Sequence, residues 1–119
     1  MANKYEDFKD KLPDWVNEEN FEWYCINHSA EHVLNQAVLE LWPGKVKRAV
    51  AHLSERGFAN DAQWDVKISE DDFPKIEEKM AEIIKRNLPF RYEEVSVDEA
   101  KKMFADNPFK LEWIEQFAA

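Results

Sequence analysis

The sequence predicts a single α+β domain over residues 1–119, with a small mixed or antiparallel sheet of three or more strands packed against about four helices. Three observations predict this class. Apolar residues recur at helical spacing in two long segments, and two other segments have the composition and alternation of strands. With 45% apolar residues and only 2 glycines, the chain has the composition of a globular protein large enough to bury a core.

The first half is expected to hold two helices followed by a strand pair. Residues 5–12 place three apolar side chains on one face of a short helix, whereas residues 14–26 fit either helix or irregular structure. From residue 27 or 29 to Leu41 the apolar residues share one side of a helix, which a Trp-Pro-Gly sequence ends. Residues 46–53 and 62–68 are predicted to be strands.

The second half is expected to alternate helix, strand and helix. A Ser-Glu-Asp-Asp sequence opens a helix with an apolar stripe from Phe73 to Ile84, and Asn-Leu-Pro ends it. Residues 90–95 are predicted to be another strand. Ser96 and Glu99 form a capping box for a short helix that reaches about Phe104, and a last helix is expected over residues 110–117.

The charge and composition exclude several classes of function. The net charge of −9 argues against a general nucleic-acid binder, because such proteins present a basic face. The one basic cluster, Lys45, Lys47 and Arg48, fits a solvated loop or an RNA contact. No apolar run approaches the ~18 residues of a membrane span, and the first residues lack the apolar core of a secretory signal. A single cysteine, Cys25, forms no internal disulfide and fits the reducing cytoplasm.

The most suggestive local pattern is His28 and His32, four residues apart on the polar side of a predicted helix. Such a pair can bind one metal ion or flank one substrate, or both side chains can simply be exposed to solvent. Ser29 stands where a zinc-protease motif has glutamate, and no third ligand is evident, so neither metal nor cofactor is predicted. Cys25 can pair with His28 as a nucleophile or serve as a small buried residue.

Four stretches together resemble threonyl-tRNA synthetase: HSAEHVLNQAVLELWPG, RGF, DDFPKIEEKMAEIIKRNLPFRYEEVSVDEAKKMF and NPFKLEWIEQF. The similar region covers residues 26–117 and corresponds to the amino-terminal half of the editing domain, a relative of the alanyl-tRNA editing fold. The resemblance implies a site that removes serine wrongly attached to threonine tRNA. It assigns His28 and His32 to the pocket, together with Lys110, and these residue types suit proton transfer and the binding of a phosphate or ribose oxygen.

The sequence departs from this family in three places. The family's D-x-C-x-G-P-H segment, which completes the pocket, has no counterpart in residues 1–119. Ala51-His52 stands where the family has Gly-Pro, and Ala59-Asn60-Asp61 where it has Tyr-Tyr-Asp. The substitutions fall within residues 46–66, which is consistent both with lost pocket constraint and with deliberate rebuilding of one surface on a truncated scaffold.

Two functions therefore compete. One is a protein-binding module, natural or engineered, whose protein partner contacts the 46–66 surface, because aromatic residues beside small and polar ones are typical of interface centres. The alternative is an editing fragment that hydrolyses mischarged seryl-threonine-tRNA through His28, His32 and Lys110. The incomplete pocket favours the binding module. Its predicted contact residues are His52, Leu53, Phe58, Ala59, Ala62 and Trp64.

Overall fold

The computed structural model describes residues 4–90 and 93–118, and in this part of the chain it has five α-helices and one hairpin. No helix there is long and apolar enough to cross a membrane. In chain order the elements are helix α1 (Tyr5–Phe8), the short 3-10 helix η1 (Lys9–Lys11), α2 (Phe21–Leu41), strands β1 (Val46–Ser54) and β2 (Gly57–Trp64), η2 (Glu70–Asp72), α3 (Phe73–Lys85), α4 (Val97–Met103) and α5 (Pro108–Ala118).

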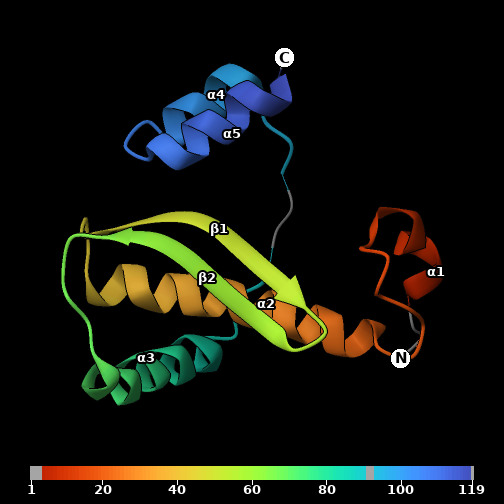
Figure 1. Ribbon diagram of the computed structural model, residues 1–119, viewed down its shortest axis with the longest axis horizontal. Helices are drawn as coiled ribbons and strands as arrows, with labels where there is room; N and C mark the ends of the chain where they lie inside the picture. Colours follow the sequence, from red (N-terminus) through yellow and green to blue (C-terminus); the bar gives the residue numbers. More distant parts are fainter. Residues whose placement is uncertain (1–3, 91–92, 119) are drawn as a thin grey trace.

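The hairpin runs along the long helix α2, and the other helices are arranged around these two elements (Figure 1). Helix α3 packs against α2, whereas the pair α4 and α5 lies beyond β1, on the side of the hairpin away from α3 (Figure 1). An ion pair of 2.6 Å between Lys101 and Glu115 links α4 to α5. The α+β class is therefore confirmed.

The sheet is smaller than predicted, because the described residues contain two strands and not three or more. In the segment expected to be a strand, Phe90 and residues 93–95 are not in a strand, and residues 91–92 lie outside the described part of the chain. Every described residue of that segment is exposed. The composition of this segment was therefore not sufficient, because a strand also requires a neighbouring strand to satisfy its backbone groups.

The second strand begins earlier and ends earlier than the predicted 62–68. The turn at residues 55–56 is tight, so pairing starts at once with Ser54 opposite Gly57, whose φ of +126° favours glycine. Pairing ends where Val46 faces Trp64, because β1 begins there. Beyond it the alternation of half-buried and exposed residues continues through residue 68 without a partner strand.

The predicted helices form, and some of their boundaries differ from the prediction. Helix α2 begins at Phe21, well before residue 27, after a turn in which Asn17 and Asn20 each accept a backbone hydrogen bond from the other. Helix α3 is followed by Asn87 in the left-handed region (φ 49°), a conformation that asparagine tolerates. Ser96 accepts from the Glu99 backbone nitrogen, so the predicted serine cap begins α4, and this bond is one half of the predicted capping box.

The core is small and lies mainly where α2 meets α3 and the hairpin. Arg86, just after α3, donates to both carboxylate oxygens of Glu40 on α2 at 2.8 Å, which fixes the two helices at the surface. The ring centroids of Trp42 and Trp64 lie 5.6 Å apart, with the rings edge to face, between the end of α2 and the end of the hairpin. The buried apolar residues are Val16, Phe21, Ala37, Val38, Val46, Ile76 and Ile83.

Candidate site on helix α2

The histidine pair lies on the exposed side of α2, within a row of aromatic rings. The ring centroids of His28 and His32 are 5.1 Å apart with a tilt of 33°, as expected for residues one helical turn apart. Tyr24 continues the row beyond His28 at 5.8 Å, and Phe90 closes it beyond His32 at 6.1 Å. Both histidines are exposed, so their nitrogens are accessible to a ligand.

A carboxylate that the sequence reasoning missed lies on the same helix. Glu31 is completely buried, and the two strands of the hairpin hold it from two directions. The Nη2 atom of Arg48 on β1 lies 2.8 Å from each carboxylate oxygen, and the Asn60 side chain on β2 donates to Oε1 at 2.7 Å. The signal was present in the sequence, because Glu31 is three and seven residues before Leu34 and Val38 of the apolar stripe.

This buried ion pair influences His32. The His32 Nδ1 atom lies 3.8 Å from Glu31 Oε2, too far for a hydrogen bond but close enough for the carboxylate to influence the pKa of His32. Partial burial lowers the pKa of His32 below its ordinary 6.5; Glu31 opposes this shift, and the positive charges of Arg48 and Lys110 add to it. His32 is therefore neutral at pH 7 and able to accept a proton.

Lys110 reaches the same neighbourhood from α5. The Asn107 side-chain oxygen accepts from the backbone nitrogens of Phe109 and Lys110, so it caps α5, and its nitrogen donates to the Arg48 carbonyl at 3.0 Å. Burial and the charge of Arg48 lower the pKa of Lys110, whereas Glu31 raises it. The fold thus ties the start of α5 to β1 through Asn107 and Arg48, whereas Arg48 also pairs with Glu31 on α2.

The residues predicted for protein binding lie on two different faces of the hairpin. Asn60 reaches Glu31 of α2, and residues two and four positions away on a strand share its face. That face therefore points toward α2, and Leu53, which pairs with Phe58, lies on it as well. Its large apolar residues are half-buried. The predicted contact residues on the helix-facing side are Leu53, Phe58, Ala62 and Trp64.

The remaining two predicted contact residues lie on the outer face. His52 pairs with Ala59 across the hairpin, and both are exposed. The Nε2 atom of His52 lies 2.7 Å from Oδ2 of Asp61, an exposed contact between the two strands. The six residues do not form one continuous surface, because alternation along each strand divides them.

Cys25 is exposed and forms no disulfide, and partial burial raises the pKa of its thiol. A thiol with a raised pKa is a weak nucleophile near neutral pH, because only the thiolate reacts. Within residues 4–90 and 93–118, no group of three or more His, Cys, Asp or Glu side chains is arranged to hold a metal ion.

Comparison of the sequence with known proteins identifies a family, although no protein-family model matches the chain. The chain is 47% identical over 93 residues to the threonine–tRNA ligase of Rubrobacter xylanophilus, an alignment that covers 78% of this chain. It is 47% identical over 94 residues to that of Thermotoga neapolitana, and 41% identical over 90 residues to that of Dehalococcoides mccartyi, covering 75% and 76% of this chain.

This chain is homologous to a segment of threonyl-tRNA synthetase. The family resemblance inferred from its motifs is thereby confirmed. The alignments span only 14% to 15% of the length of these relatives. Most of this chain therefore corresponds to one segment of a threonyl-tRNA synthetase.

Proposed function

We propose that this threonyl-tRNA synthetase homologue carries the histidine and lysine part of an editing site, which hydrolyses the ester between serine and threonine tRNA. The observation that carries the proposal is the exposed histidine pair on α2, which lies beside the buried Glu31 and its partner Arg48. His28 lies one turn from His32, at a ring distance of 5.1 Å. Action on tRNA also assigns the protein to the cytoplasm.

In the proposed reaction, neutral His32 accepts a proton from a water molecule that attacks the ester carbonyl carbon. A bond forms between the water oxygen and that carbon, and the bond from carbon to the ribose oxygen breaks. The proton then passes to the ribose oxygen, so serine and free tRNA leave. General base catalysis of this kind typically contributes about 10²–10⁴-fold.

Lys110 and His28 complete the proposed assignment of roles. The ammonium group of Lys110 holds an oxygen of the terminal ribose or phosphate, and His28 positions the attacking water beside His32. Glu31, Arg48 and Asn60 fix α2 against the hairpin beneath the two histidines, so the imidazoles keep their geometry. Positioning of this kind supplies much of the rate of an enzyme.

The test is release of serine from seryl-threonine-tRNA by the purified chain. The wild-type chain is expected to release serine above background, and the His28→Ala/His32→Ala double variant and Lys110→Ala are expected to lose this activity. His52→Ala is the matched control, because it removes an exposed imidazole on the far side of the hairpin. Absence of release by the wild-type chain, or equal loss in the control, refutes the proposal.

A second candidate is protein binding, natural or engineered, through the 46–66 surface. It is favoured by the exposed outer face of the hairpin, where His52, Ala59 and Asp61 are accessible. A partner that contacts His52 there loses affinity as the imidazole gains charge near pH 6. Constant affinity between pH 8 and pH 5.5 excludes His52 from such an interface.

A further inference from the structure

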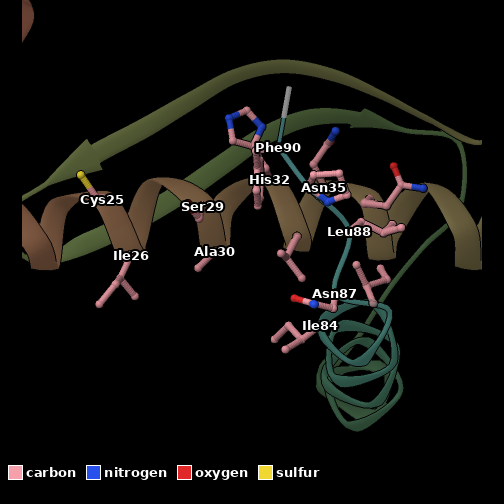
Figure 2. Close-up of a pocket in the computed structure, with 14 residues that line it drawn as sticks. Cys25, Ile26, Ser29, Ala30, His32, Asn35, Ile84, Asn87, Leu88 and Phe90 are labelled. Atoms are coloured by element: carbon pink, nitrogen blue, oxygen red, sulfur yellow. The ribbon is translucent and has the colours of Figure 1, made fainter. Parts of the chain in front are cut away.

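The carboxylate of Glu31 approaches one of the two ring nitrogens of His32. Oε2 of Glu31 is 3.8 Å from Nδ1 of His32, and the Glu31 side chain is fully buried whereas that of His32 is 45% exposed. Figure 2 shows His32 extending from α2 beside Phe90, on the opposite side of the helix from Ile26. The His32 ring therefore has a buried negative charge beside Nδ1 and is still open to solvent.

The position of this carboxylate is fixed by both strands of the hairpin. Nη2 of Arg48 on β1 lies 2.8 Å from each carboxylate oxygen, and the Asn60 side chain on β2 donates to Oε1 at 2.7 Å. The carboxylate cannot turn away from His32 without breaking hydrogen bonds of a buried group, which is costly. Its negative charge therefore stays beside His32.

Glu31 exerts the largest influence of any single charge on His32. Partial burial lowers the pKa of His32 most, and the carboxylate comes next and acts in the opposite direction. His28 on the same helix, Arg48 on β1 and Lys110 on α5 act less strongly, and each of them favours the neutral ring. Because the ring is neutral at pH 7, the open question is which of its nitrogens carries the proton.

A neutral imidazole carries a proton on one nitrogen and accepts a proton at the other. A neighbouring carboxylate favours the proton on the nearer nitrogen, because the positive end of the N–H dipole then points toward the negative oxygen. The other tautomer directs a lone pair toward the carboxylate and is disfavoured. For His32 this places the proton on Nδ1 and the lone pair on Nε2.

We propose that Glu31 is a positioning residue, which holds neutral His32 in the Nδ1–H tautomer so that Nε2 accepts the proton of the attacking water. The role of Nε2 rests on the proposed hydrolysis, whereas the tautomer is a property of the chain without substrate. Control of the tautomer matters to a histidine base, because the wrong tautomer presents an N–H group to the nucleophile where a lone pair is needed.

The experiment is a long-range nitrogen–proton NMR correlation of the 3 histidines in the purified chain. It is recorded at about pH 8, above the ordinary pKa of histidine, and shows which nitrogen of each ring carries the proton. His32 is expected as the Nδ1–H tautomer. His52 is the internal control of opposite sign, because Oδ2 of Asp61 lies 2.7 Å from its Nε2 and favours the proton there. His28 is the reference ring, since in the part of the chain that the structure describes no hydrogen bond or ion pair joins it to a carboxylate.

Two variants separate the carboxylate from the packing around it. Glu31→Leu/Arg48→Met removes both charges together and is expected to stay folded, because no buried charge is left unpaired. In this variant the ratio of Nδ1–H to Nε2–H for His32 is expected to fall at least about threefold. Asn60→Ala is the matched control, because it removes a hydrogen bond to Glu31 but keeps the carboxylate, and it is expected to leave the His32 tautomer unchanged.

An Nε2–H tautomer of His32 in the wild-type chain refutes the proposal, and this result does not depend on any variant. An Nδ1–H tautomer that persists in the double variant, or that is lost equally in Asn60→Ala, also refutes it. The measurement contains no tRNA, so its outcome is distinct from that of the serine-release assay. A chain with the Nδ1–H tautomer that releases no serine refutes the hydrolysis and leaves the control of the tautomer by Glu31 in place.

Discussion

Replacing Glu31 with glutamine removes one charge from the centre of the fold while nearly preserving the shape of the side chain. Glu31 is fully buried, and its partner Arg48 is 16% exposed. The substitution leaves the Arg48 guanidinium without its counter-charge. It also places the new amide NH2 group of residue 31, a hydrogen-bond donor, against the donor groups of Arg48 or Asn60. Arg48 has no alternative acceptor in the described residues, where its buried Nε already lacks a hydrogen-bond partner.

Removing one partner of a buried ion pair typically costs about 3–5 kcal/mol. The residual exposure of Arg48 lets water reach the guanidinium, which places the expected loss near ~3 kcal/mol. A domain of this kind has a free energy of unfolding of about 5–15 kcal/mol, so the loss is a large fraction of the total.

Urea unfolding followed by fluorescence of the 5 tryptophans measures this change. With a slope of ~1.5 kcal/mol per molar urea, the midpoint for Glu31→Gln is expected to fall by about 2 M. Glu22→Gln is the matched control, because it makes the same change at an exposed position of α2 and is expected to stay within about 0.5 kcal/mol of wild type.

The double variant Glu31→Leu/Arg48→Met separates the effect of charge from that of packing. It removes both charges together and is expected to recover most of the stability that Glu31→Gln loses, because no buried charge is left unpaired. The reasoning is refuted if Glu31→Gln lies within about 1 kcal/mol of Glu22→Gln, since the buried pair then contributes no more than a surface pair does.

Three further outcomes follow from the same contacts. Asn107→Ala removes the cap of α5 and the bond to the Arg48 carbonyl, and is expected to cost about 1–2 kcal/mol in urea unfolding; Asn107→Asp, which keeps the capping oxygen, is expected to lose less. Arg86 lowers the pKa of Glu40 from 4.5 to about 2, so this pair stabilises the fold above pH 4.5 and the contribution is lost as pH falls toward 2. The stability of Arg86→Gln is therefore expected to fall less than that of wild type over this range. Parallel curves of stability against pH for the two proteins contradict the assignment of this effect to the pair of Arg86 and Glu40. The pKa of His32 is lowered, so its protonation opposes folding and stability decreases as pH falls below 6.5; a titration midpoint for His32 at or above 6.5 by NMR contradicts this.

Much of the local structure could be predicted because it depends on neighbours in the sequence. The stripe from Phe73 to Ile84 and the Ser96 cap specify α3 and α4 through contacts three or four residues apart. The same rule placed His28 and His32 on the exposed side of α2, where the structure has them. The family, too, could be recognised from motifs alone.

The errors arose where a segment depends on distant partners. Residues 90–95 were predicted to be a strand, but the described part of this segment does not form one. The prediction left residues 14–26 open between helix and irregular structure, and the structure assigns the second half of this range to α2, which begins at Phe21. The predicted contact residues lie on two faces of the hairpin, a division that depends on which face of β2 points toward α2.

The sequence by itself determined the helical and hairpin segments, the exposed histidine pair and the membership in a family. Each of these depends on local residue spacing or on short sequence motifs. Only the tertiary structure decided that a buried Glu31 meets Arg48 and Asn60, and that Asn107 at the start of α5 bonds to the backbone of Arg48. The physical reason is that charge interactions and burial depend on distance in space, which spacing along one helix or strand does not specify.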